Sequence, residues 1–358
     1  MITPNWLKIL TNLFKNTNKK LYLVGGFVRD YVMGSTAKDY DLCTDALPDE
    51  IIKILKNYHL DQRGKKFGVV VVFGQDLPKE GVEIATFRKD LTYGRHPEIQ
   101  VGVSINDDVN RRDITISGLF YDLDSNKIVD LVGGIDDIKK GIIRMIGDPI
   151  ERIKEDQLRV MRVARFAARY GFKIDDATKK AIINNADLTE ISKERISEEI
   201  IKAEKQSKSL CAYFLILKDL NLLDKIFYDS KLNNPIICFN SLELILAQLL
   251  LNNDYTKFHK VLVDEYKFSN PLMEKVKFLV SFKDFKAENV LSYYRKYEQL
   301  EIDEETLTIW LKANFKQMVK FLDYSPSHNS QELMNMGYVG KKLGDKIKEI
   351  ETINYNSL

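Results

Sequence analysis

The pattern of apolar and polar residues divides the chain into two parts of different character. In the first part, short apolar and β-branched runs are closely spaced, with helical patterns between them, which predicts strands alternating with helices. The predicted strands are Leu21–Val24, Tyr40–Thr44, Gly68–Phe73, Val82–Phe87 and Ile99–Val103. This alternation predicts an α/β unit built on a small sheet.

From about Asp148 onward, the apolar residues follow the period of amphipathic helices to the end of the chain. The first of these helices is expected over Pro149–Tyr170, with Gly171 as its stop. An earlier helix is expected to begin at Leu47–Glu50, since proline and acidic residues suit a first turn. We therefore predict a head over residues 1–147, a helical neck over 148–205, and a helical body and tail over 206–358.

Composition adds few constraints to this division. With 358 residues, the chain is too long for one ordinary core, and 54 basic against 52 acidic residues give no overall nucleic-acid footprint. The widely spaced Cys43, Cys211 and Cys238 are expected to be reduced thiols, without a disulfide or a structural zinc. No stretch is long and apolar enough to cross a bilayer, so we expect a cytoplasmic protein without a membrane partner.

The first candidate site follows the strand at Leu21–Val24. Glycines at 25 and 26 let backbone N–H groups approach phosphate oxygens at a helix amino terminus, and Arg29, one turn later, can clamp the anion. The arrangement fits a triphosphate. A glycine pair after a strand is also common in ordinary turns, so the interpretation as a phosphate-binding site needs support from a second sequence feature.

That second feature is the sequence Asp39-Tyr40-Asp41. Side chains at i and i+2 of a strand point to the same face, so Asp39 and Asp41 can share divalent cations. Mg²⁺ in such a site would support phosphoryl transfer by activating a ribose hydroxyl and neutralising pyrophosphate. Glu83 is a candidate third carboxylate, although an exposed charge on an alternating strand is an equally good interpretation.

Four blocks, in this order, resemble the class II tRNA nucleotidyltransferase and bacterial poly(A) polymerase family over Leu21 to about Glu199. They are Val24–Asp30 with Asp39–Asp41, Arg111–Thr115, Gly147–Pro149 with Glu155–Ala167, and Ile191–Ile196. The resemblance implies a polymerase-beta-like head with a small mixed sheet, followed by an all-α neck, body and tail.

The same resemblance assigns roles to individual residues. It implies that Gly26, Arg29 and Arg112 contact the triphosphate or ribose, and that Asp39 and Asp41 bind the metal.

The family likeness also implies that Asp156 and Arg159 read the nucleobase. Cytosine and adenine each present an exocyclic amine beside a ring-nitrogen acceptor, which a carboxylate and a guanidinium complement. On a continuous helix Asp156 and Arg159 share one face, which Arg162 and Arg165 extend as a basic stripe. A solvated helix face with ordinary ion pairs is the alternative.

Two further segments bear on the product. Asp90–Pro97 resembles the loop that helps the family switch from cytosine to adenine, but it is shorter than in many members; an ordinary hairpin connection is the alternative. Met336–Ile347 resembles the tail of tRNA-specific members, although it also reads as a lysine-rich helix start.

Ile114 and Ser117 replace the family's usual phenylalanine and asparagine.

We therefore expect a Mg²⁺-dependent enzyme that adds C and A to the tRNA 3′ end from CTP and ATP. A CC- or A-adding partial enzyme and a poly(A) polymerase are the next alternatives. A non-catalytic RNA-binding protein and a small-molecule nucleotidyltransferase agree less well with the intact aspartates and the long helical half. The sequence leaves the oligomeric state undetermined.

Overall fold

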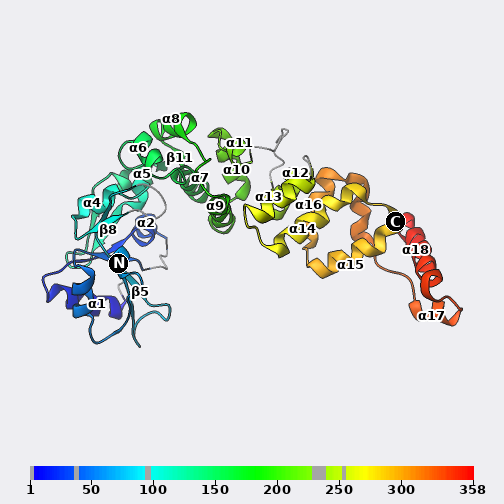
Figure 1. Cartoon of the computed structure of the whole chain (residues 1–358), viewed down its shortest axis with the longest axis horizontal. Helices are drawn as coiled ribbons and strands as arrows, with labels where there is room; N and C mark the ends of the chain where they lie inside the picture. The colour runs from blue at the N-terminus through cyan, green and yellow to red at the C-terminus, as the bar shows by residue number, and fades with distance from the viewer. Residues whose placement is uncertain (1–3, 36–39, 93–97, 228–238, 252–254) are drawn as a thin grey trace. The chain divides into compact units, whose positions relative to one another are not determined.

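The computed structural model describes residues 4–35, 40–92, 98–227, 239–251 and 255–358. The chain forms two compact units, a first unit of Met1–Ile191 with Leu215–Lys225 and a second unit of Ser192–Phe214 with Ile226–Leu358. Figure 1 traces the elements of both along the chain. The three-part division at residues 147 and 205 stays a prediction.

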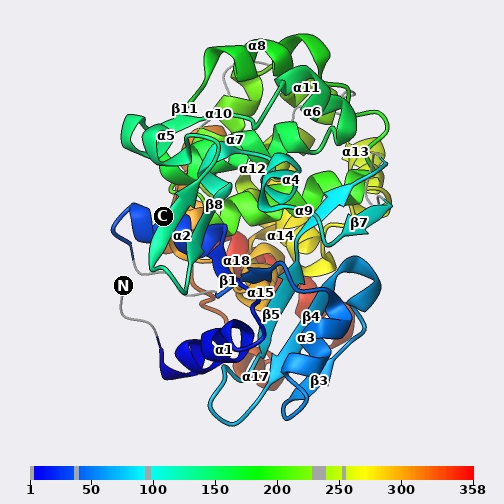
Figure 2. The same cartoon turned by 90° about the vertical axis from the view of Figure 1, so that its left-hand side faces the viewer.

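The first unit is built around a seven-stranded mixed sheet of order β3-β4-β5-β2-β1-β8-β9, seen from two sides in Figures 1 and 2. β2 and β5 run parallel, and the other neighbours run antiparallel. The strands are β1 (Leu21–Val24), β2 (Leu42–Thr44), β3 (His59–Asp61), β4 (Val69–Phe73), β5 (Val82–Thr86), β8 (Leu119–Asp122) and β9 (Lys127–Asp130). The predicted α/β head with a small mixed sheet is confirmed.

Strand boundaries follow the sequence pattern less closely than strand existence does. β1 has the predicted bounds, whereas the strand expected over Tyr40–Thr44 begins only at Leu42. The pattern does not predict β3, β8 or β9, because each has three or four residues and ends in an aspartate.

Helices pack against the sheet through apolar stripes. In α1 (Asn5–Lys15), Leu7, Leu10 and Phe14 recur at helical spacing and are fully buried, and the helix lies beside β1 (Figure 2). The other helices around this sheet are α2 (Gly26–Val32), α3 (Pro48–Ile54) and α4 (Ile105–Asn110). α3 begins at the predicted proline.

A small hairpin follows β5. β6 (Arg88–Asp90) pairs with β7 (Ile99–Val101), with Asp90 opposite Ile99. Of the segment Asp90–Pro97, Asp90 ends β6, and residues 93–97 lie outside the described part of the chain. Leu91, directly after β6, is 54% exposed.

The rest of the first unit is mainly helical, and two expectations for it are wrong. The helix expected over Pro149–Tyr170 is two helices, α6 (Pro149–Glu155) and α7 (Arg159–Tyr170), although it ends at Gly171 as predicted. A strand also occurs after Asp148, because the two-residue β11 (Lys173–Ile174) pairs with β10 (Ile142–Ile143) and is too short to carry a pattern. The remaining helices are α5 (Gly134–Lys140) and α8 (Asp176–Asn185).

Within its described residues, the second unit contains helices and no strand, as predicted for the body and tail. Its helices are α9 (Lys193–Gln206), α12 (Leu242–Leu251), α13 (Tyr255–Asp264), α14 (Asn270–Ser281), α15 (Val290–Leu300), α16 (Glu304–Asn314), α17 (Ser330–Asn335) and α18 (Gly340–Ser357), while α10 (Leu210–Asp219) and α11 (Leu223–Ile226) contain residues of both units. Trp310 is fully buried in this unit, and its indole N–H donates to the Leu279 carbonyl at 2.8 Å.

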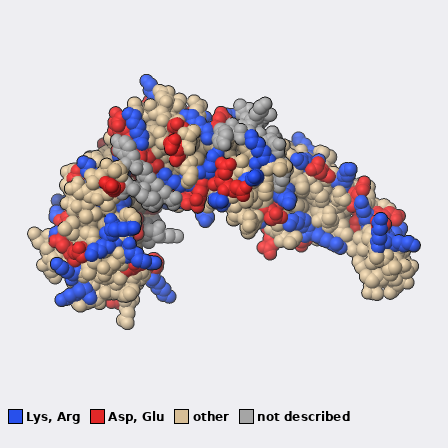
Figure 3. All heavy atoms as spheres, viewed as in Figure 1, with Lys and Arg blue, Asp and Glu red and all other residues tan. Residues whose placement is uncertain are grey.

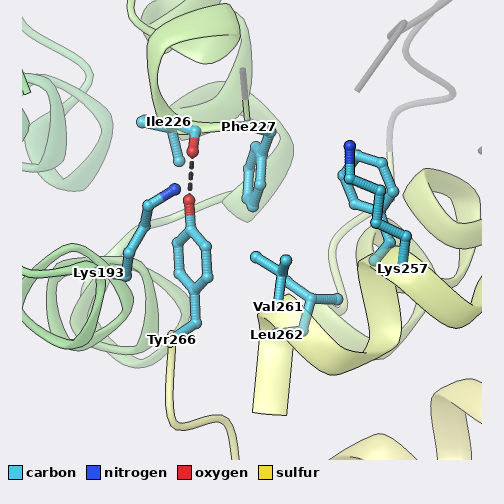
Figure 4. A pocket seen from close by; sticks show the side chains of 8 residues that line it. Lys193, Ile226, Phe227, Lys257, Val261, Leu262 and Tyr266 are labelled. Atoms are coloured by element: carbon cyan, nitrogen blue, oxygen red, sulfur yellow. Dashed lines mark hydrogen bonds between the residues drawn. The ribbon is translucent and has the colours of Figure 1, made fainter. Parts of the chain in front are cut away.

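A small pocket lies between α9, α11 and α13 within the second unit (Figure 4). Tyr266 is buried there and donates its hydroxyl to the Ile226 carbonyl, while the Lys193 ammonium lies 5.1 Å from the centre of the Tyr266 ring. Lys193 belongs to the Ile191–Ile196 block, so this block contributes to the packing of the second unit.

The cysteines differ from the expectation. Cys43 is free and buried, but Cys211 is disulfide-bonded, so the prediction of reduced thiols throughout is wrong. Packing can bring cysteines that are distant in sequence within bonding range, and wide spacing does not exclude this. Cys238 lies outside the described residues.

No helix in the described part of the chain is long and apolar enough to cross a membrane. Basic and acidic side chains are intermingled on the face seen in Figure 3, in agreement with the formal net charge of +2.

The helix at the end of the chain, α18, is anchored by a buried carboxylate. Glu351 is 1% exposed and accepts hydrogen bonds from the Tyr324 hydroxyl at 2.7 Å and from the backbone N–H groups of Ser327 and His328 at 2.9 and 2.7 Å. Burial alone would raise the pKa of Glu351, but these hydrogen bonds outweigh it and lower the pKa to about 2.

We predict that Glu351→Gln destabilises the second unit by about 1–3 kcal/mol at neutral pH, because the amide cannot satisfy the same buried donors. Glu351 has a lower pKa in the folded state than its ordinary 4.5, so its contribution is complete above that value and declines as the pH falls towards about 2. Chemical denaturation at several pH values measures the difference. Glu349→Gln, at an exposed ion pair with Lys346, is the matched control and should change stability by less than about 0.5 kcal/mol. An equal loss in both variants would contradict the prediction.

Candidate active site

The turn between β1 and α2 has a conformation that requires glycine. Gly25 has φ 60° and ψ −118°, a backbone conformation that residues with a Cβ atom rarely adopt. Its carbonyl accepts the Arg29 N–H at 3.1 Å. α2 begins at Gly26, directly after the turn. The first backbone N–H groups of a helix project outward at its amino end without a partner in the helix, so the turn presents partial positive charge to an anion.

Two arginines lie against this turn. A Cβ atom added to Gly26 would lie 3.4 Å from Nη2 of Arg29, and one added to Gly25 would lie 3.7 Å from Nη1 of Arg112. The structure therefore brings Gly26, Arg29 and Arg112 together, although Arg29 and Arg112 are 83 positions apart in the sequence. Two guanidinium groups beside glycine backbone form a site suited to phosphate oxygens.

Arg112 is fixed by a carboxylate that the sequence analysis missed. Asp108 is 1% exposed, and its Oδ2 accepts from Nε and Nη2 of Arg112 at 3.1 and 3.0 Å. Its Oδ1 accepts from Nε of Arg111 at 3.0 Å and from the backbone N–H of Arg88 at 3.2 Å. The i, i+3 and i, i+4 spacing from Asp108 to the two arginines is the signal that could have identified it.

Arg29 is more buried than a simple phosphate clamp requires. It is 4% exposed, its Nε donates to Asp30 at 3.0 Å, and its guanidinium lies 5.0 Å from the ring centre of Tyr170 on α7. Ser117 accepts from its Nη1 at 3.5 Å. Weak hydration of the guanidinium permits this stacking on aromatic faces. Ser117, which replaces the family's usual asparagine, thus lies in the site and was missed as a contact.

A pair of carboxylates, one just before β2 and one on β5, lies along neighbouring strands of the same unit. Asp41 is exposed just before β2, and its carbonyl accepts the Val24 N–H at 3.1 Å. β2 and β5 are parallel with Leu42 beside Ile84, so Asp41 and Glu83 occupy equivalent positions one residue earlier. Partial desolvation, and secondly the charge of Asp41, raise the pKa of Glu83.

Electrostatic repulsion between two neighbouring carboxylates is relieved by a divalent cation, and their oxygens are the ligands that Mg²⁺ prefers. Asp39 lies outside the described residues. The expectation that Asp39 and Asp41 point to the same face of a strand therefore stays a prediction. Among the described residues, no group of three or more histidine, cysteine or acidic side chains is arranged to hold a metal.

Asp156 lies at the break between α6 and α7. Its backbone is extended, with φ −152° and ψ 107°, and its Oδ1 accepts the Leu158 N–H at 3.1 Å. This local hydrogen bond competes with the helical pattern and interrupts the helix. The expectation that Asp156 and Arg159 share one face of a continuous helix is therefore wrong, although the two residues adjoin the same turn.

Arg159 is buried and is held in three directions. Its Nη1 donates to the Glu155 carboxylate and, at 2.8 Å, to the Arg152 carbonyl, while its Nη2 donates to the Arg111 carbonyl at 3.2 Å. Glu155 also accepts from Arg152, whose Nη2 donates to the Arg112 carbonyl at 2.6 Å. These bonds tie the beginning of α7 to the segment that carries Arg112.

The next two arginines of α7 do not form one exposed stripe. Arg162 donates through Nε to Asp113 at 2.7 Å, and its side chain is 37% exposed. Burial alone would raise the pKa of Asp113, but the Arg162 charge and hydrogen bonds hold it below the usual range. Arg165 is 5% exposed, with its guanidinium 4.5 Å from the centre of the Phe166 ring. The predicted stripe therefore consists of anchored arginines with different surroundings.

The alternative interpretation of this helix, ordinary ion pairs, holds for Glu155, which pairs with Arg152 and Arg159 at a spacing of three and four residues. The sequence analysis missed Phe166 and Tyr170, whose stacked rings face the cationic side chains. Their helical spacing reads equally well as ordinary core packing.

Comparison with known families gives two matches along the chain. Residues 21–144 match the family described as "Poly A polymerase head domain", and residues 171–231 match the family described as "Probable RNA and SrmB- binding site of polymerase A".

Similar curated proteins carry two names. Poly(A) polymerase I of Escherichia coli O6:H1 is 33% identical over 72% of this chain and 57% of its own length, so the chain spans little more than half of that relative. The CCA-adding enzyme of Lactococcus lactis subsp. lactis is 32% identical over 92% of this chain and 87% of its own length.

Solved structures have the same fold. The CCA-adding enzyme of Bacillus stearothermophilus in complex with CTP is 22% identical, with a TM-score of 0.65 over 99% of this chain and 94% of that chain. A tRNA-processing enzyme in an apo form is also 22% identical, with a TM-score of 0.71 over 98% of both chains. Together with the curated relatives, these likenesses lead to one conclusion: the chain belongs to the family of tRNA nucleotidyltransferases and bacterial poly(A) polymerases.

Proposed function

We propose that this chain is a template-independent nucleotidyltransferase that adds C and A to the 3′ end of tRNA, using CTP and ATP and releasing pyrophosphate. The observation that carries the proposal is the Gly25-Gly26 turn flanked by Arg29 and Arg112, in a unit that also aligns Asp41 with Glu83. Such a site holds a triphosphate and a divalent cation, which are the two requirements of phosphoryl transfer.

The choice of product rests on one CCA-adding relative that matches over most of both lengths, while two others match over 59% and 51% of this chain. The match to the Lactococcus lactis CCA-adding enzyme covers 92% of the chain, against 72% for the Escherichia coli poly(A) polymerase I. This difference favours CCA addition over poly(A) synthesis. A CC-adding or A-adding partial enzyme has the same site, and the short connection at Asp90–Pro97 keeps that alternative open.

In the proposed mechanism, backbone N–H groups at Gly26 and the guanidinium groups of Arg29 and Arg112 bind the triphosphate and orient it. Asp39 and Asp41 would hold Mg²⁺, with Glu83 as a further oxygen ligand; the repulsion between Asp41 and Glu83 fits this role. When bound, the cation would lower the pKa of the tRNA 3′-hydroxyl and neutralise the charge of the leaving pyrophosphate.

The base-reading step is assigned to Asp156 and Arg159. The contacts of Arg159 with Glu155, Arg152 and Arg111 use three of the five N–H donors of a guanidinium, which leaves Nε and one Nη2 hydrogen for a ring nitrogen. Asp156 is partly exposed and supplies an acceptor for the exocyclic amine of cytosine or adenine. Arg162 and Arg165 would support the same surface of α7.

We assign the head, residues 1–147, to catalysis, the neck, 148–205, to the nucleobase, and the body and tail, 206–358, to tRNA. In the tail, Met336 and Val339 are 71% and 67% exposed next to Lys341 and Lys342, a surface suited to RNA backbone and exposed bases. We also propose that the chain acts in the cytoplasm, where tRNA and nucleoside triphosphates are available.

The product assay separates the alternatives. Purified protein is incubated with tRNAs ending at the discriminator base, at C and at CC, with CTP and ATP separately and together, and product lengths are read on a sequencing gel. CCA addition predicts three, two and one added nucleotides, with little extension of an unrelated RNA. Long adenine tails on every RNA would instead identify a poly(A) polymerase, and extension that stops at CC would identify a partial enzyme.

We predict that Asp41→Ala lowers nucleotide incorporation by on the order of a thousandfold or more, because it removes a metal ligand that is not a core side chain. Single-turnover incorporation at saturating Mg²⁺ measures the loss, and thermal unfolding checks the fold. Asp49→Ala, an exposed carboxylate of the same unit, is the charge-matched control and should retain activity.

Glu83→Ala, measured in the same assay, tests the third ligand. Full turnover by this variant would remove Glu83 from the mechanism, and full turnover by Asp41→Ala would refute the metal site itself.

We predict that Asp156→Ala relaxes base selection by about 10- to 100-fold while changing triphosphate binding much less, since it removes the acceptor for the exocyclic amine. The measurement compares kcat/KM for CTP and ATP with that for UTP and GTP. Glu151→Ala, at an exposed ion pair on α6, is a suitable control. Unchanged discrimination against UTP and GTP would count against the base-reading assignment.

A further inference from the structure

The first turn of α1 carries an aromatic residue that the mechanism does not use. Trp6 stands four residues before Leu10 and eight before Phe14, so it extends the apolar stripe with which α1 packs against β1. Leu10 and Phe14 are fully buried, whereas Trp6 is partly exposed at the end of the stripe. Its ring meets Tyr40 edge to face, with 5.1 Å between centroids and an interplanar angle of 75°.

Tyr40 has a second aromatic neighbour on α2. The Tyr40 and Phe27 rings have centroids 4.7 Å apart and are tilted by 38°. Phe27 is 6% exposed and follows Gly26, so it is held by the helix that begins at the phosphate-binding turn. Three rings thus join α1, the residue before Asp41 and the start of α2, all within the first unit.

This aromatic cluster, Trp6, Tyr40 and Phe27, has a direct consequence for Asp41. The Asp41 side chain is exposed, and its backbone carbonyl is held by the Val24 N–H. Tyr40 immediately precedes it, so the ring contacts restrain the backbone that sets the direction of the Asp41 carboxylate. A metal ligand is effective when the shell around it fixes its orientation before the ion binds.

We propose that Trp6 is a positioning residue for the metal site, which acts through Tyr40 to hold the Asp41 carboxylate in register with Glu83. This inference rests on the proposed function, because it assumes that Asp41 is a metal ligand. Trp6 itself contacts neither substrate nor metal in this proposal. Its role is to make part of the site rigid from a helix that contributes no other residue to it.

The test measures binding of Mn²⁺ alone to the nucleotide-free full chain, followed by the electron paramagnetic resonance signal of the free ion. Trp6→Leu should weaken Mn²⁺ binding by about tenfold, since a ligand would lose its supporting contact. Trp6→Phe keeps an aromatic ring and should stay within about twofold of the unchanged protein. Ile9→Ala, on the same helix and 37% exposed in the starting protein, is the matched control and should bind Mn²⁺ normally.

A double-mutant cycle tests whether Trp6 acts through Tyr40. Tyr40→Leu should weaken Mn²⁺ binding at least as much as Trp6→Leu, since it also removes the contact with Phe27. The double variant should be no weaker than Tyr40→Leu, because the contact between Trp6 and Tyr40 is already lost in that variant. Additive losses would overturn the proposal. Thermal unfolding shows whether Trp6→Leu is folded. If it is not, Mn²⁺ binding by Tyr40→Leu becomes the test, and normal binding by that folded variant overturns the proposal.

Asp41→Asn separates failure of this inference from failure of the proposed function. Mn²⁺ binding that is equal in the unchanged protein and in Asp41→Asn would refute the metal site and the inference with it. Weakened binding in Asp41→Asn together with normal binding in folded Trp6→Leu would overturn the inference and leave the metal site standing. Weakened binding in both, with rescue by Trp6→Phe, supports the positioning role.

Discussion

The buried carboxylate of Asp108 is the constraint on which the arrangement of the candidate site depends. It accepts from Arg111, from two nitrogens of Arg112 and from the backbone of Arg88, so both of its oxygens are used. An isolated buried carboxylate would be costly, and only this full set of charge-assisted hydrogen bonds makes the burial tolerable. In return, Arg112 is held against the Gly25 turn, and the carbonyls of Arg111 and Arg112 are presented to the arginines of α6 and α7.

Arginines of this unit have two roles, structural anchoring and proposed ligand binding, and the sequence does not distinguish between these roles. Arg152 and Arg159 are structural in part, because each donates to a backbone carbonyl of the Arg111-Arg112 segment and both share Glu155. The planar guanidinium can meet several acceptors at once, which a lysine could not do with the same geometry. The proposed phosphate-binding and base-reading groups are therefore parts of one hydrogen-bonded network, so a change at one is expected to alter the other.

The sequence predicted the head, the glycine turn and the grouping of Gly26, Arg29 and Arg112, because those features depend on local chain geometry and on a recognisable order of blocks. It failed where partners are distant or local competition is subtle. The helix break at Asp156 follows from a side chain bonding to its own backbone, which periodicity does not register. The sequence offers Glu83 as a third carboxylate only beside an equally good alternative, and strand pairing is what aligns it with Asp41. The disulfide of Cys211 depends on packing, which spacing alone does not reveal.

The distribution of tryptophan offers a practical consequence. The chain has two tryptophans, and Trp6 belongs to the first compact unit whereas Trp310 belongs to the second. Trp6 is partly exposed beside Tyr40, while Trp310 is fully enclosed and hydrogen-bonded to Leu279. Indole emission shifts to the red as water gains access, so the two units carry separate, spectrally distinct reporters. Intrinsic fluorescence can therefore follow the unfolding of each unit in the same sample, without an added label.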